Sequence, residues 1–98
     1  MSQRLRLLIV DDSAPTRDSL RRLLEFESGI EVVGEAADGE EAIVQARTLL
    51  PDVILMDINM TPMDGITATE VISSELPHSV IVMMSIQGEQ EYLRQAMA

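Results

Sequence analysis

Short unbroken apolar runs alternate along the chain with longer segments in which apolar residues recur every three or four positions. The runs contain four to six residues, mostly Val, Ile, Leu and Met, and cover residues 5–10, 30–33, 53–56 and 80–84. Continuous apolar runs of this length predict strands that are buried on both faces, which is typical of a parallel sheet.

The segments between and after these runs have the i, i+3, i+4 spacing of amphipathic helices. We expect helices over about residues 15–27, 38–50 and 64–76, and a fourth from about residue 89 onward. The second begins with Asp38 three residues before Glu41, the spacing of a capping box, and ends before a proline. The residues expected on the inner faces of the first and third helices are Leu20, Leu23, Leu24, Ile66, Thr69, Ile72 and Leu76.

The strict alternation of strand and helix predicts the fold class. It indicates an α/β fold with a parallel sheet, right-handed connections and helices on both faces of the sheet. The 98 residues hold four strand–helix pairs and allow one domain.

Polar side chains stand at the carboxyl ends of three predicted strands, where open parallel sheets bind ligands. Asp11 and Asp12 follow the first strand, Asp57 the third and Ser85 the fourth. If these strands are neighbours, three carboxylates and a hydroxyl share one shallow pocket. A single acid after a strand is often only a helix cap or a turn residue, and for Asp12 alone that role is an equal alternative.

Three converging carboxylates repel one another, so a stable pocket needs a cation. The chain has no Lys, and no Arg directly follows a strand end. Carboxylate oxygens, the absence of Cys and a single remote His favour Mg²⁺ over softer metals. A carboxylate beside such an ion can act as a nucleophile that accepts a phosphoryl group.

The charge balance narrows the choice of partners. The chain carries 17 acidic residues against 7 arginines, a formal net charge of −10, so we expect no direct binding to nucleic acid or to an anionic membrane. Without Cys, disulfides and thiolate metal sites are excluded. No apolar stretch has the length of a signal peptide or a membrane span, and we expect a cytoplasmic protein. Arg21 and Arg22 are placed on the outer, solvated side of the first helix.

The combination of these residues resembles the receiver domain of two-component response regulators. The matching motifs are Leu-Ile-Val-Asp-Asp at residues 8–12, Val-Ile-Leu-Met-Asp-Ile-Asn-Met at 53–60, Met-Asp-Gly at 63–65, and Ser85. The segment 32–39 is also typical of these domains. The resemblance spans residues 5–98 and implies a flavodoxin-like fold with strand order 2-1-3-4-5.

The resemblance also implies a role for each site residue. Asp57 would accept a phosphoryl group from a histidine kinase or a phosphotransfer protein. Asp11, Asp12 and Asp57 would hold Mg²⁺, with the backbone carbonyl of Asn59 as a further ligand. Ser85 would hydrogen-bond the phosphoryl oxygens and begin the conformational switch that relays the signal.

The chain departs from the family pattern at several positions. Receivers have a fifth strand that ends in a Lys contacting the phosphoryl group, and then a fifth helix, whereas this sequence contains no Lys. We therefore expect residues 1–98 to form a C-terminally truncated receiver domain that lacks the fifth strand–helix pair, with the output domain missing. Pro62 stands one position later than is usual, and Ile86 replaces a small residue.

Other functions stay open beside this one. A pseudo-receiver would keep the acids but act only as a protein-interaction or dimerisation module. A small hydrolase with Asp57 as nucleophile is less favoured, because Asn59 stands where its second acid is needed. For the receiver interpretation we expect no enzyme activity beyond Mg²⁺-dependent self-phosphorylation and dephosphorylation. We also expect self-association through an exposed strand at 80–84 or through the fourth-helix region.

Overall fold

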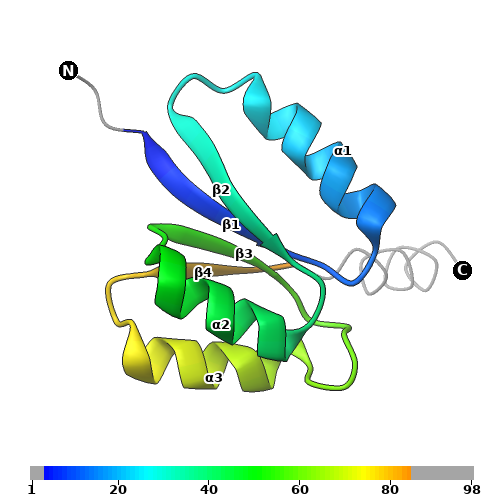
Figure 1. Cartoon of the computed structure of the whole chain (residues 1–98), viewed down its shortest axis with the longest axis vertical. Coiled ribbons are helices and arrows are strands. Elements are labelled where there is room, and N and C mark those ends of the chain that lie inside the picture. Colours follow the sequence, from blue (N-terminus) through cyan, green and yellow to red (C-terminus); the bar gives the residue numbers. More distant parts are fainter. Residues whose placement is uncertain (1–3, 85–98) are drawn as a thin grey trace, which may run out of the picture.

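The computed structural model describes residues 4–84 and holds one sheet of four parallel strands. The strands are β1 (Leu5–Val10), β2 (Ile30–Ala36), β3 (Val53–Asp57) and β4 (Val80–Met84), in the spatial order β2-β1-β3-β4 (Figure 1). For these four strands, this is the predicted flavodoxin-like order. The predicted fourth helix and Ser85 lie outside the described residues.

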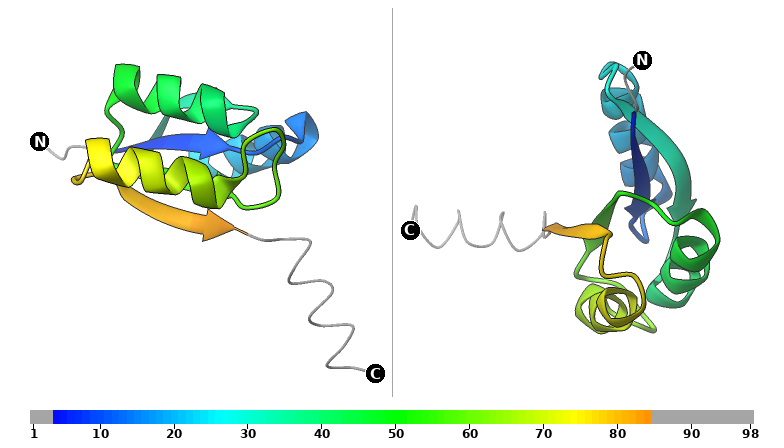
Figure 2. Two further views of the ribbon diagram at one scale, coloured as in Figure 1. Left: turned by 90° about the horizontal axis from the view of Figure 1, so that it is seen from below. Right: turned by 90° about the vertical axis from the view of Figure 1, so that its left-hand side faces the viewer.

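Helices connect the strands and cover both faces of the sheet, as predicted. They are α1 (Ala14–Glu25), α2 (Gly39–Leu49) and α3 (Gly65–Glu75). Helix α1 packs on β1 and β2 from one side, while α2 and α3 lie side by side on the other (Figure 2). The core fills the space beneath α2 and α3, and its fully buried large side chains on that side are Leu8, Val10, Ile54, Met56 and Ile72.

Each helix begins at a side chain that accepts a hydrogen bond from a free backbone N–H of the first turn. Asp38 Oδ1 accepts from the Glu41 N–H at 2.8 Å, where the sequence predicted a cap. Asp64 Oδ1 does the same for the Thr67 N–H at 2.7 Å, at the start of α3. Such caps satisfy donors that the helix itself leaves without partners.

Two predicted inner residues lie on the surface instead. Leu23 of α1 is 67% exposed, because α1 packs only on β1 and β2 and its remaining sides meet no other described element. Ile66 of α3 is 53% exposed, and the small Ala68 is buried in the core in its place. Helical spacing alone could not decide which of two neighbouring positions faces the sheet.

Strand β4 is not buried on both faces, as its apolar run alone predicts, but exposed, as was also expected for residues 80–84. Among the described residues β4 pairs only with β3, and Val80, Val82 and Met83 are exposed. An unpaired edge strand with apolar side chains is a surface open to another strand. Strand β2 is also longer than predicted, reaching Ala36, and its register on β1 shifts so that Val33 has no partner.

Candidate functional site

Three carboxylates meet at the carboxyl end of the sheet. Asp11 and Asp12 directly follow β1, and Asp57 is the last residue of β3, which pairs with β1 up to Val10 and Met56. One carboxylate oxygen from each acid lies within 4.8 Å of the others. The structure thus brings together the three acids that the sequence analysis placed at this edge.

Asp11 is the innermost of the three acids and is only 5% exposed. Its backbone N–H donates to the Ala36 carbonyl at 3.0 Å, and its Oδ1 accepts from the Ser13 N–H at 2.8 Å. Asp12, by contrast, is exposed. A buried carboxylate with a fixed backbone beside an exposed one leaves the site open to solvent on one side.

The Asp57 carboxylate is held by the turn that follows it. Its Oδ1 accepts a hydrogen bond from the Asn59 N–H at 3.0 Å. Partial burial raises the pKa of Asp57 above its ordinary value, and the charges of Asp11 and Asp12 raise it further. The backbone N–H groups of Asn59 and Asp12 act in the opposite direction. A carboxylate whose ionised form is disfavoured in this way is the kind that a cation stabilises.

The oxygen donors fit a hard divalent cation. The cluster is made of carboxylates alone, and Mg²⁺ prefers carboxylate oxygens together with water and phosphate oxygens. The backbone carbonyl of Asn59 stays a predicted ligand, since only its N–H has an observed partner here. Ser85, the remaining predicted site residue, lies outside the described residues.

Gly65 fixes the backbone beneath Asp57, a role that the sequence analysis missed. A Cβ on Gly65 would lie 2.2 Å from the Asp57 carbonyl oxygen, so only glycine fits there. The Gly65 N–H also donates to the Ile58 carbonyl at 3.1 Å, and the Ile58 N–H to the Met84 carbonyl at 3.0 Å. The turn after Asp57 is therefore tied both to the start of α3 and to the end of β4. Gly65 belongs to the family motif, but the motif alone did not show why it is glycine.

Arg17 is the second residue that the sequence analysis missed. Its Nη1 donates to the Asp11 carbonyl oxygen at 2.6 Å, and its Nε to Glu35 of β2 at 3.2 Å. Arg21 donates to the same Glu35 carboxylate at 2.7 Å, so its predicted place on the solvated side of α1 is wrong. The spacing of four residues places Arg17 and Arg21 on one helix face, but nothing in the sequence shows that Glu35 lies opposite that face.

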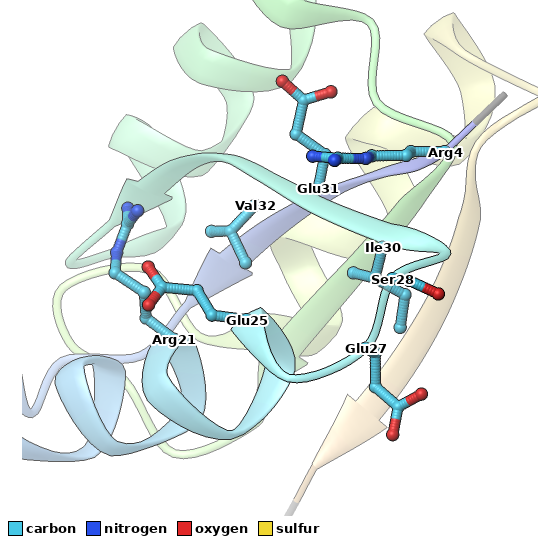
Figure 3. A pocket seen from close by; sticks show the side chains of 8 residues that line it. All are labelled: Arg4, Arg21, Glu25, Glu27, Ser28, Ile30, Glu31 and Val32. Carbon is cyan, nitrogen blue, oxygen red and sulfur yellow. The ribbon is translucent and has the colours of Figure 1, made fainter.

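A hollow of about 220 Å³ lies elsewhere on the molecule, between the end of α1 and β2. Figure 3 shows its lining, which contains none of the three acids: Arg4, Arg21, Glu25, Glu27, Ser28, Ile30, Glu31 and Val32. Its side chains are mostly charged and belong to the opposite end of the strands. It does not extend the carboxylate site. Within residues 4–84, no helix combines the length and the apolar character that a membrane span requires.

Comparison with known proteins decides the family. The profile of the family described as response regulator receiver domain matches residues 7–98. The chain belongs to this family. The receiver assignment made from the sequence is therefore confirmed.

Solved receiver domains share the fold. The response regulator domain of Thermotoga maritima CheB superposes with a TM-score of 0.80 at 40% identity, covering 85% of this chain and 61% of that one. CheY from Borrelia burgdorferi, solved in a complex with CheX, BeF₃ and Mg²⁺, gives a TM-score of 0.80 at 32% identity, covering 95% of this receiver and 70% of that chain.

Curated relatives are much longer than this receiver. A protein-glutamate methylesterase/protein-glutamine glutaminase from Caldanaerobacter subterraneus subsp. tengcongensis is 46% identical over 89 residues, which are 91% of this chain and 24% of that protein. One from Alkalilimnicola ehrlichii is 49% identical over 83 residues, 85% of this chain and 21% of that protein. These names correct the expectation of a protein without enzyme activity, which is wrong: the relatives are enzymes, and this chain matches one part of them.

Proposed function

We propose that this receiver accepts a phosphoryl group on Asp57 from a phosphohistidine donor and relays the signal through the end of β4. The observation that carries the proposal is the convergence of Asp11, Asp12 and Asp57 within 4.8 Å at the sheet edge. In the transfer, an Asp57 carboxylate oxygen forms a bond to phosphorus while the bond from phosphorus to the donor imidazole breaks, and the imidazole nitrogen takes a proton.

Asp57 is the acid best placed to be the nucleophile. It is partly exposed, whereas Asp11 is buried and already accepts the Ser13 N–H. The Asn59 N–H orients the Asp57 carboxylate through Oδ1. A carboxylate that is already oriented loses less conformational entropy on reaching the geometry for attack on phosphorus, which lowers the barrier to transfer.

We propose that Asp11, Asp12, Asp57 and the Asn59 carbonyl hold Mg²⁺. When bound, Mg²⁺ would offset the negative charge of the carboxylates and of the incoming phosphoryl oxygens. The receiver of known structure solved with BeF₃ and Mg²⁺ supports this choice of ion.

The route to the signal begins at the turn after Asp57. The Ile58 N–H donates to the Met84 carbonyl at 3.0 Å, and Ser85 is the next residue along the chain. We infer that the Ser85 hydroxyl binds the phosphoryl oxygens and that this new charge-assisted bond shifts the end of β4. Phosphorylation of Asp57 thus acts on the end of β4, which pairs directly with the strand that carries Asp57.

The upstream partner would be a cytoplasmic histidine kinase or a phosphotransfer protein. For the downstream partner, 46–49% identity to the receiver part of protein-glutamate methylesterases/protein-glutamine glutaminases favours an output enzyme of that class. In that arrangement residues 1–98 belong to the regulatory domain, and phosphorylation would control an active site located outside this chain.

The test is intact-mass spectrometry after incubation with Mg²⁺ and a small acyl phosphate donor. The wild-type chain should gain one phosphoryl group, and Asp57→Asn should gain none. Asp18→Asn, which removes an exposed carboxylate on α1, is the matched control and should gain one. No adduct on the wild type would contradict the proposal and favour the interaction-only pseudo-receiver.

A further inference from the structure

The Asp11–Asp12 peptide group is held by a side chain that comes from neither acid. Arg17 Nη1 donates to the Asp11 carbonyl at 2.6 Å, a short bond from a charged donor. The Arg17 side chain is only 18% exposed, so this bond is largely shielded from water. The contact thus constrains the peptide that joins two of the four proposed metal ligands.

Glu35 in turn holds Arg17 in place. Its carboxylate accepts from Arg17 Nε at 3.2 Å and from Arg21 Nε at 2.7 Å, and Arg21 reaches it from one turn further along α1. Figure 3 shows Arg21 extending from α1 towards β2. The guanidinium of Arg17 therefore has two contacts, one with the Asp11 carbonyl just after β1 and one with Glu35 of β2, and its planar fork leaves it few other orientations.

Planarity carries the effect of this bond to Asp12. In a trans peptide the carbonyl and the N–H point in opposite directions. Fixing the Asp11 carbonyl on Arg17 therefore also fixes the direction of the Asp12 N–H. Without Arg17, the peptide could rotate, and with it the exposed Asp12 side chain.

We propose that Arg17 is a positioning residue that orients the Asp11–Asp12 peptide for Mg²⁺ and for Asp57. This inference rests on the proposed function. Its alternative is that Arg17 only ties α1 to β2 through Glu35. The two roles predict opposite changes in Mg²⁺ affinity when Arg17 is replaced. The positive charge of Arg17 repels a nearby cation, so its removal without any change in geometry should strengthen Mg²⁺ binding. Positioning predicts the reverse.

The experiment compares Arg17→Met with Arg21→Met in the full chain. Both variants remove an arginine from Glu35 and keep an apolar side chain, but only Arg17 touches Asp11. Mg²⁺ affinity is measured by titration calorimetry, and backbone amide chemical shifts are recorded on metal-free protein. Arg17→Met should weaken Mg²⁺ binding roughly tenfold, the lower end of what loss of a residue supporting metal ligands costs. The Mg²⁺ affinity of Arg21→Met should stay within about twofold of that of the wild type, because Arg21 does not contact a proposed metal ligand.

The metal-free spectra separate this inference from the proposed function. In Arg17→Met the Asp12 amide should shift, while in Arg21→Met it should not. If the wild type fails to bind Mg²⁺, the proposed function fails, and the Asp12 shift still tests the role of Arg17. Unchanged or tighter Mg²⁺ binding in Arg17→Met, or an unmoved Asp12 amide, overturns the inference. If Arg17→Met does not fold, Arg17→Gln, which also removes the charge, takes its place with the same two readouts.

Discussion

The Cα of Gly65 lies against the backbone of Asp57, so closely that a Cβ on Gly65 would be 2.2 Å from the Asp57 carbonyl oxygen. The start of α3 and the end of β3 are thereby packed backbone to backbone. The position of Asp57 thus depends on a residue eight places further along the chain.

Replacing Gly65 with Ala should therefore displace the turn that carries Asp57. The Gly65 N–H bond to Ile58 holds the two backbones together against this displacement, so we expect a loss of about 1–3 kcal/mol in the free energy of unfolding. Mg²⁺ affinity should fall as well. Urea denaturation and Mg²⁺ titration measure the two effects. Gly29→Ala is the control, since an added Cβ there meets nothing within 4 Å. Equal behaviour of the two variants would contradict this packing argument.

The raised pKa of Asp57 predicts that Asp57→Asn is more stable than the wild type without metal, and that Mg²⁺ reverses this order. Burial and the neighbouring acids raise this pKa in the folded state, so ionised Asp57 destabilises the metal-free protein at neutral pH. Asp57→Asn should therefore melt at a higher temperature than the wild type without metal. That difference should shrink as the pH falls through the raised pKa, because the wild-type carboxyl is then neutral too.

Saturating Mg²⁺ should reverse the order of the two proteins. A ligand at 100 times its dissociation constant adds about 2.7 kcal/mol to the stability of the protein that binds it. The wild type gains this stabilisation. Asp57→Asn has a neutral amide in place of one carboxylate ligand, so it binds Mg²⁺ more weakly and gains less. Melting curves followed by circular dichroism, with and without Mg²⁺, provide the measurement. A wild type that stays less stable than Asp57→Asn in high Mg²⁺ would count against a metal at this site.

Asp64 should make the fold sensitive to acid. Hydrogen bonds from the N–H and side chain of Thr67 lower the pKa of Asp64 in the folded state. The stability this provides is fully present above the unfolded-state pKa, near 3.8, and is lost as the pH falls through the lower folded-state value. Asp64→Asn keeps a capping side chain but does not titrate. Because Asn lacks the stabilising charge, the urea midpoint of Asp64→Asn should lie below that of the wild type at pH 7, and the two midpoints should converge as the pH falls. A difference that does not change with pH would refute this.

The exposed β4 edge predicts self-association of the 98-residue chain. Val82 is 45% exposed on a strand that pairs only with β3 in the described part of the chain. Sedimentation velocity should show larger species as the protein concentration rises. Val82→Lys should reduce them, because a charge on an edge strand opposes pairing. Val44→Lys, at an exposed apolar position of α2, should not. A wild type that stays monomeric throughout would show that this edge is not used.

The fold was predictable because, along the described chain, the short apolar runs coincide with the observed strands, and the segments with helical spacing coincide with the observed helices. The order of acids at strand ends then placed the site, since parallel strands end at one edge. What could not be predicted depends on how a loop and the following helix fold back onto the end of a strand. The burial of Gly65 against Asp57 and the reach of Arg17 to Asp11 need the tertiary structure, and neither leaves a periodic signal.

The errors have a physical cause of the same kind. Leu23 satisfies the helical spacing but lies on a helix that covers only two strands, so its partner surface is absent from the described residues. Arg21 was assigned to solvent because nothing in α1 itself shows that Glu35 lies opposite. Spacing identifies a face, while burial depends on what packs against that face.

The central claim is that Asp57 is the phosphoryl acceptor, and peptide mapping tests it most directly. The phosphorylated wild-type chain is trapped by borohydride reduction of the acyl phosphate, digested and sequenced by tandem mass spectrometry. We expect one modified residue, at position 57, formed only with Mg²⁺ present. Modification at Asp11 or Asp12, or at position 57 to the same extent without a divalent cation, would contradict it.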